Sequence, residues 1–90
     1  MVHFEKTYNQ KINESIYQTL VDNAKTSLTL QNGEIDFELT ESISNKQLNA
    51  NQGTLTKFRI LKNSKIIGFL EVFRNYNNLE LLIYSTPINN

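Results

Sequence analysis

The chain has 90 residues, enough for one domain with a single thin core. Nine Lys and Arg residues balance nine Asp and Glu residues, and this zero net charge argues against a general nucleic-acid-binding protein. The sequence contains no cysteine, which excludes disulfides, thiolate metal sites and cysteine nucleophiles.

No stretch of the sequence is long and apolar enough to cross a membrane. The first ten residues, MVHFEKTYNQ, lack the apolar segment of a signal peptide, so we expect a cytoplasmic protein. Asparagine is unusually frequent, at 13 residues. AT-rich genomes favour Asn codons, and the composition therefore indicates a low-GC bacterium or one of its mobile elements.

The N-terminal third has the spacing of an amphipathic helix. Its apolar side chains recur every three to four residues, and polar residues fill the opposite side. The apolar stripe consists of Tyr8, Ile12, Ile16, Tyr17, Leu20, Val21 and Ala24. Thr7 and Asn9 are candidates to cap its first turn. Residues 2–6 precede it, either as a short strand or as a frayed end.

The apolar period then changes to two, which is typical of a strand with one buried face. The alternating apolar residues are Leu28, Leu30, Ile35, Phe37 and Leu39. Asn32-Gly33 lies between them, and Asn-Gly favours a type I′ turn, because that turn needs positive φ at both central positions. We therefore predict a β-hairpin over residues 28–39 with Asn32-Gly33 at its tip. Residues 41–53 follow with few apolar side chains, and their length and composition predict a mobile loop.

Three antiparallel strands are predicted by the stretch KFRILKNSKIIGFLEVFRNYNNLELLIY, residues 57–84. A two-residue turn at Asn63-Ser64 would pair Lys62 with Lys65. A four-residue turn over residues 75–78 would connect the second strand to the third and pair Arg74 with Leu79.

This register sorts the side chains of the three strands onto two faces. Phe58, Phe69 and Tyr84 would form one cross-strand row, an arrangement that stabilises sheets. Leu70 and Val72 would lie on the opposite face, so both faces are apolar. One helix covers one face only. The first hairpin, a second copy of the chain and another protein are the three candidates to cover the second face.

The order of elements predicts an α+β fold. We expect one N-terminal amphipathic helix packed on an antiparallel sheet of about five strands, built from a hairpin, a long loop and a three-stranded meander. Residues 1–90 would form a single domain.

Two groups of residues are candidates for partner binding. Phe58, Phe69 and Tyr84 would offer aromatic side chains of the kind found at the centre of protein interfaces, unless they are ordinary core. The second group is acidic and consists of Glu34, Asp36 and Glu38. Carboxylates projecting the same way from one strand suit a basic partner surface, and a solvated sheet face is the alternative.

The sequence indicates catalytic groups of residues less strongly than partner-binding groups. Glu71 and Glu80 would lie diagonally on the aromatic face, and two carboxylates beside aromatic rings are typical of sugar-cleaving sites. Lys57, Arg59 and Arg74 would share the other face, where they could contact a phosphate or protect an edge strand from aggregation. His3 is the single histidine, and no spacing typical of metal ligands surrounds it.

We therefore expect a small non-catalytic protein-binding module without cofactor, metal, membrane or nucleic-acid ligand. The specific hypothesis is a phage or mobile-element accessory protein that inhibits a host or defence enzyme. A structural homo-oligomer, such as a homodimer, is one alternative. The other is a small enzyme, because the order of helix and meander resembles the RelE group of ribonuclease toxins. Those toxins are strongly basic, whereas this chain is neutral.

Overall fold

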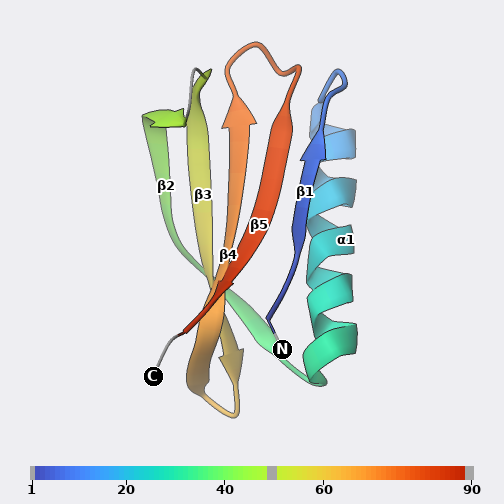
Figure 1. Cartoon of the computed structure of the whole chain (residues 1–90), viewed down its shortest axis with the longest axis vertical. Helices are drawn as coiled ribbons and strands as arrows, with labels where there is room; N and C mark the ends of the chain where they lie inside the picture. The colour runs from blue at the N-terminus through green and yellow to red at the C-terminus, as the bar shows by residue number, and fades with distance from the viewer. Residues whose placement is uncertain (1, 49–50, 89–90) are drawn as a thin grey trace.

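The computed structural model describes residues 2–48 and 51–88 (Figure 1). Within them, the elements in chain order are β1 (Glu5–Tyr8), α1 (Glu14–Asn32), β2 (Asp36–Leu48), β3 (Asn51–Lys62), β4 (Lys65–Asn75) and β5 (Leu81–Pro87). The strands form one antiparallel sheet in the order β1-β5-β4-β3-β2, and the N-terminal helix packs on it. The predicted α+β class is confirmed.

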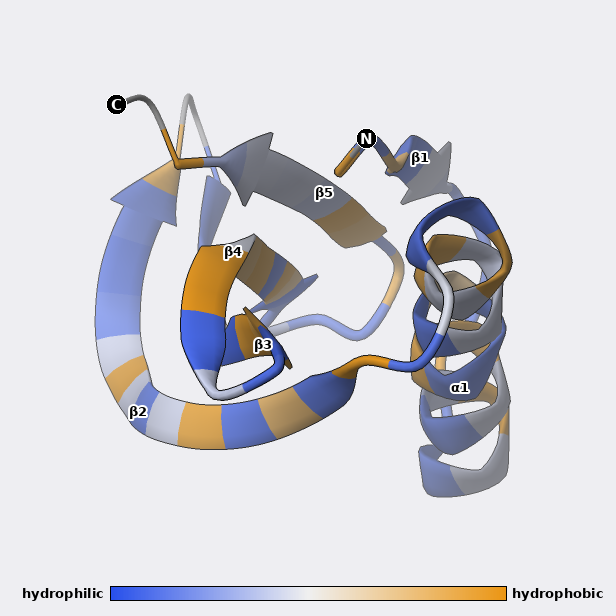
Figure 2. Ribbon diagram, turned by 90° about the horizontal axis from the view of Figure 1, so that it is seen from below, coloured by the Kyte–Doolittle hydropathy of each residue, from blue (hydrophilic) through white to orange (hydrophobic). Residues whose placement is uncertain are grey.

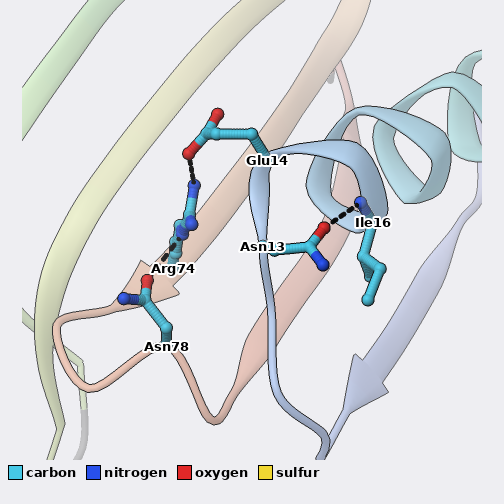
Figure 3. Close-up of polar contacts among 5 residues, drawn as sticks. All are labelled: Asn13, Glu14, Ile16, Arg74 and Asn78. Atoms are coloured by element: carbon cyan, nitrogen blue, oxygen red, sulfur yellow. Dashed lines mark hydrogen bonds and ion pairs between the residues drawn. The ribbon is translucent and has the colours of Figure 1, made fainter.

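Helix α1 begins later than predicted. Asn13 is its N-cap, and the Asn13 side-chain oxygen accepts a hydrogen bond from the Ile16 backbone N–H at 2.8 Å (Figure 3). The predicted caps, Thr7 and Asn9, precede this start, because the chain first forms the short strand β1. Tyr8, placed on the helix by its spacing, therefore belongs to the sheet.

The hairpin predicted over residues 28–39 is wrong, because α1 continues to Asn32. Leu28 extends the buried helical stripe, whereas Leu30 lies on the outer side of the helix and is 82% exposed. Gly33 has φ +82° and donates its N–H to the Thr29 carbonyl at 2.8 Å, so it caps the helix C-terminus. Asn-Gly serves a helix end as well as a hairpin turn, since both need positive φ.

The mobile loop predicted at 41–53 is largely strand. Residues 41–48 belong to β2 and residues 51–53 to β3, while residues 49–50 lie outside the described part of the chain. β2 is an edge strand that pairs with β3 alone, and its side chains at 41–47 are exposed. The end-on view shows it as a wide arc that starts beside α1 and curves around β3 and β4 (Figure 2). An exposed edge tolerates polar residues, which explains its loop-like composition.

The turn between β3 and β4 agrees with the prediction. Lys62 pairs with Lys65 across Asn63-Ser64. Both turn residues have positive φ, 52° and 66°, as a type I′ turn requires.

Beyond that turn the register shifts by one residue, which the sequence prediction did not include. Leu61 pairs with Ile66, but Ile60 pairs with Gly68, so Ile67 is an extra residue in β4. This β-bulge exchanges the faces of β3 relative to β4.

The connection between β4 and β5 is longer than predicted. Arg74 pairs with Leu81 instead of Leu79. Because the shift is by two residues, the side chains of β5 keep the faces predicted for them relative to β4.

The core lies between α1 and one face of the sheet, which we call the helix face. Its buried members are Val2, Ile12, Val21, Ala24, Leu28, Ile60, Leu70, Val72, Leu81 and Ile83. In the described part of the chain, no helix is long and apolar enough to span a bilayer.

Candidate protein-binding face

The opposite side of the sheet, which we call the open face, carries side chains that alternate with those of the core. A charged row crosses all five strands on this face. In spatial order from β2 to β1 it consists of Glu41, Lys57, Glu71, Tyr84 and Glu5. The single helix of the described residues packs on the helix face, so no helix lies over this row.

Two further rows flank the charged one. The outer row, toward the β3–β4 turn, consists of Glu38, Arg59, Phe69 and Thr86. The apolar row, toward the β4–β5 connection, consists of Ile43, Leu55, Phe73, Leu82 and Thr7. Aromatic, aliphatic and charged side chains therefore lie on one face of the sheet, with Leu55 and Phe73 of the apolar row buried in it.

The side chains of the open face are held by contacts with one another. The Lys57 ammonium lies 4.5 Å from the centre of the Phe69 ring, a cation–π geometry. The Arg59 Nε lies 3.4 Å from a Glu38 carboxylate oxygen, with these side chains 43% and 56% exposed. Solvent screens that exposed ion pair, which contributes under about 1 kcal/mol.

Tyr84 is the open-face residue with the strongest electrostatic perturbation. Burial raises its pKa, and the negative charge and hydrogen bonding of Glu71 raise it further, to about 12. At neutral pH the phenol is therefore protonated and serves as a donor to the Glu71 carboxylate. This contact joins β5 to β4 within the charged row.

The predicted aromatic row does not form. The bulge at Ile67 pairs Phe58 with Leu70, which puts Phe58 on the helix face with the Lys25 ammonium 4.5 Å from its ring centre. Phe69 and Tyr84 do share the open face, on neighbouring strands, but they lie in adjacent rows.

The predicted acidic row is only partly present. Glu34 lies in a bend before β2, whereas Asp36 and Glu38 lie two residues apart within it and share a face. Glu38 is paired with Arg59. Three carboxylates presented together by one strand are therefore not found.

The predicted pair of Glu71 and Glu80 is also wrong. Glu80 lies in the β4–β5 connection, where its carboxylate accepts a hydrogen bond from the Asn51 side chain at 3.0 Å. Its backbone carbonyl accepts from the Asn75 N–H at 3.2 Å, four residues along β4 from Glu71. At the rise of a strand this is about 13 Å, too far for the carboxyl pair of a sugar-cleaving site.

Arg74 does not share a face with Lys57 and Arg59, as the sequence register predicted. Its guanidinium forms an ion pair with Glu14 at 2.7 Å and lies 5.0 Å from the centre of the Tyr17 ring. It also donates to the Asn78 side chain at 2.8 Å (Figure 3). These contacts tie the start of α1 to the end of β4, which indicates a structural role.

His3 contacts the end of α1 through its backbone. Its backbone N–H and carbonyl both bond the Gln31 side chain. Within residues 2–48 and 51–88, no group of three or more potential metal ligands and no pocket is found.

Comparisons with known proteins gave no match to any family model, curated protein or solved structure. Function is therefore inferred from the residues of the chain itself. Sequence reasoning placed Glu71 and Leu82 on the same face as Phe69 but put Lys57 and Arg59 on the opposite face, whereas they lie beside Phe69. Gly68 was the available signal, because an isolated glycine within a strand pattern suggests a bulge.

Proposed function

We propose that this protein is a small non-catalytic module that binds another protein through its open face. The observation that carries the proposal is the composition of that face: half-buried Phe69 and Tyr84 beside Lys57, Arg59 and Glu71. Aromatic residues and arginine are enriched at protein interfaces relative to the rest of protein surfaces.

The contacts within the open face support binding by a rigid surface. Lys57 is stacked on Phe69, and Tyr84 is bonded to Glu71, so these side chains are ordered before a partner arrives. An ordered side chain loses less conformational entropy on association. A partner would therefore meet aromatic edges and charges already fixed by the sheet.

A different protein fits this face better than a second copy of the chain. Permanent homodimer interfaces are more apolar than transient ones and resemble a domain core cut in half. Here a charged row crosses the whole sheet between the apolar and outer rows. The hypothesis of a phage or mobile-element inhibitor of a host or defence enzyme stays a prediction.

Site-specific photo-crosslinking tests the proposal. A photoreactive residue is placed at Thr86, which is exposed on the open face, and in a separate variant at Thr19, which is exposed on α1. Each variant is irradiated in a lysate of the cells that encode the chain, and the products are identified by mass spectrometry. We expect Thr86 to capture one defined protein and Thr19 to capture none of it.

The matched threonines make the result interpretable. Equal capture of the same protein from both positions would contradict binding through the open face. A product consisting of two copies of this chain would favour the homo-oligomer instead. Loss of the Thr86 product in a Phe69→Ala background would support the proposed surface.

A further inference from the structure

The far end of the β2–β3 hairpin is bent where its ladder is irregular. Residues 46–48 and 51–53 form this end, which we call the tip. Just before it, the register between β2 and β3 shifts between Ile43 and Lys46, and Asn45 has φ +59°. The end of β2 turns toward β3 at this place (Figure 1). A bulge bends the strand that contains it.

One side chain from the β4–β5 connection bonds the bulge directly. The Tyr76 hydroxyl accepts a hydrogen bond from the Asn45 backbone N–H and donates one to the Asn45 side-chain oxygen at 2.8 Å. The Tyr76 backbone N–H also donates to the Gln52 carbonyl at 3.0 Å. A single residue thus contacts both strands of the hairpin, 31 residues away from Asn45 along the chain.

The connection that presents Tyr76 is itself fixed to the rest of the molecule. The Asn78 carbonyl accepts from the Ile12 N–H at 2.7 Å, and the Asn78 side chain accepts from Arg74 (Figure 3). The connection therefore joins the segment that leads into α1 to the tip.

The tip depends on the Tyr76 bonds, together with the hydrogen bond from the Asn51 side chain to Glu80, because little apolar packing holds it. Residues 41–47 of β2, which include the first two residues of the tip, are exposed, and Tyr76 is itself 49% exposed, whereas Gly53 at the other end of the tip is buried. Segments with few buried apolar contacts and exposed hydrogen bonds open locally at low free energy. In contrast, Leu55 and Phe73, next to the tip on the open face, are buried.

We propose that Tyr76 is a latch that holds the tip closed, and that its release lets the tip open about the bulge at Ser44–Asn45. Opening there would change access to the Leu55 and Phe73 end of the open face. That consequence for a partner rests on the proposed function, whereas the latch itself does not.

Amide hydrogen exchange on the full chain tests the latch without any partner. Tyr76→Phe removes the hydroxyl and keeps the ring. The control, Tyr17→Phe, removes a hydroxyl from α1 and keeps the ring beside Arg74. We expect the hydrogen-bonded amides of the tip to exchange at least about fivefold faster in Tyr76→Phe, with the amides of α1 and β5 unchanged.

A second variant separates the two hydrogen bonds. Asn45→Gly tolerates the positive φ and keeps the N–H donor but loses the side-chain acceptor. We expect faster exchange at the same amides, smaller than in Tyr76→Phe. Three outcomes would overturn the latch: unchanged exchange at the tip in Tyr76→Phe, an equal increase in Tyr17→Phe, or a uniform increase over the whole sheet.

Discussion

At the residue scale, Gly68 lies where the end of β5 and the N-terminal residues approach β4. A Cβ added there would stand 2.6 Å from the Thr86 carbonyl oxygen and 3.0 Å from Val2 Cγ1. The bulge at Ile67 places this position on the helix face, so the close approach belongs to the core.

Alanine at Gly68 should therefore destabilise the fold by crowding. We expect Gly68→Ala to lower the free energy of unfolding by about 1–3 kcal/mol. Gly33→Ala is the comparison, because Gly33 has open space around it and a positive φ, and its cost should be about 1 kcal/mol. Urea denaturation measures both, and a larger loss at Gly33 would be inconsistent with the close packing at Gly68.

The titration of Tyr84 in alkaline solution can be followed to test the structure of the open face. Its pKa is raised to about 12, so the folded protein holds this proton between pH 10 and 12 while the unfolded chain releases it. The stability that this group contributes is present below pH 10 and is lost as pH rises toward 12. Burial also raises the pKa of Tyr8, so we expect two tyrosines to titrate late in the ultraviolet spectrum and the latest of them to be missing in Tyr84→Phe.

Substitutions can separate the two causes of the raised pKa of Tyr84, which are burial and the charge of Glu71. Glu71→Gln removes the charge beside the phenol and should lower the pKa of Tyr84, leaving it above the ordinary value because burial remains. Glu5→Gln changes the other carboxylate paired with Tyr84 in the charged row and serves as the control. Equal effects of the two variants would show that Glu71 has no special role.

At the element scale, the helical conformation of residues 28–30 in α1 determines which of their side chains pack in the core. Leu28 is fully buried in it, and Leu30, two residues on, is 82% exposed. We expect Leu28→Ala to cost about 2–5 kcal/mol of stability and Leu30→Ala less than about 0.5 kcal/mol. Thermal or urea unfolding checks this, and similar losses would favour the strand pattern, in which both leucines share one face.

The same helix shows why part of the fold could be predicted and part could not. The stripe from Ile16 to Ala24 fits only a helix, and that element was predicted. Residues 28–32 fit a strand as well, and packing against the sheet selected the helix through Leu28. An alternation of two apolar residues is too short to decide between the periods.

The sheet also has features that the sequence predicted and features that it did not. Turn chemistry at Asn63-Ser64 predicted the β3–β4 pairing correctly at the turn. A single extra residue, Ile67, then exchanged the faces of β3 relative to β4, so one of the three predicted aromatic residues, Phe58, moved to the core side. The start of the edge strand β2, residues 36–39, was predicted as strand, whereas residues 41–48 were predicted as a loop because an exposed strand needs few apolar residues.

At the scale of the whole molecule, one helix and a five-stranded sheet leave the two sheet faces unequal. The helix face holds the main core, and the open face carries the charged, apolar and outer rows. The net charge of the chain is zero, so neither copies of the chain nor a partner are repelled at long range. The local pattern on the open face should then determine what binds.

The affinity for the protein captured through Thr86 tests the role of the open face most directly. Phe69→Ala and Leu30→Ala each remove one large apolar side chain, from the open face and from the outer side of α1 respectively. With both variants folded by circular dichroism, we expect Phe69→Ala to weaken binding at least about 30-fold, the effect of a residue worth about 2 kcal/mol. Leu30→Ala should bind like the unchanged chain. Unchanged binding by Phe69→Ala, or an equal loss in Leu30→Ala, would contradict recognition through the open face.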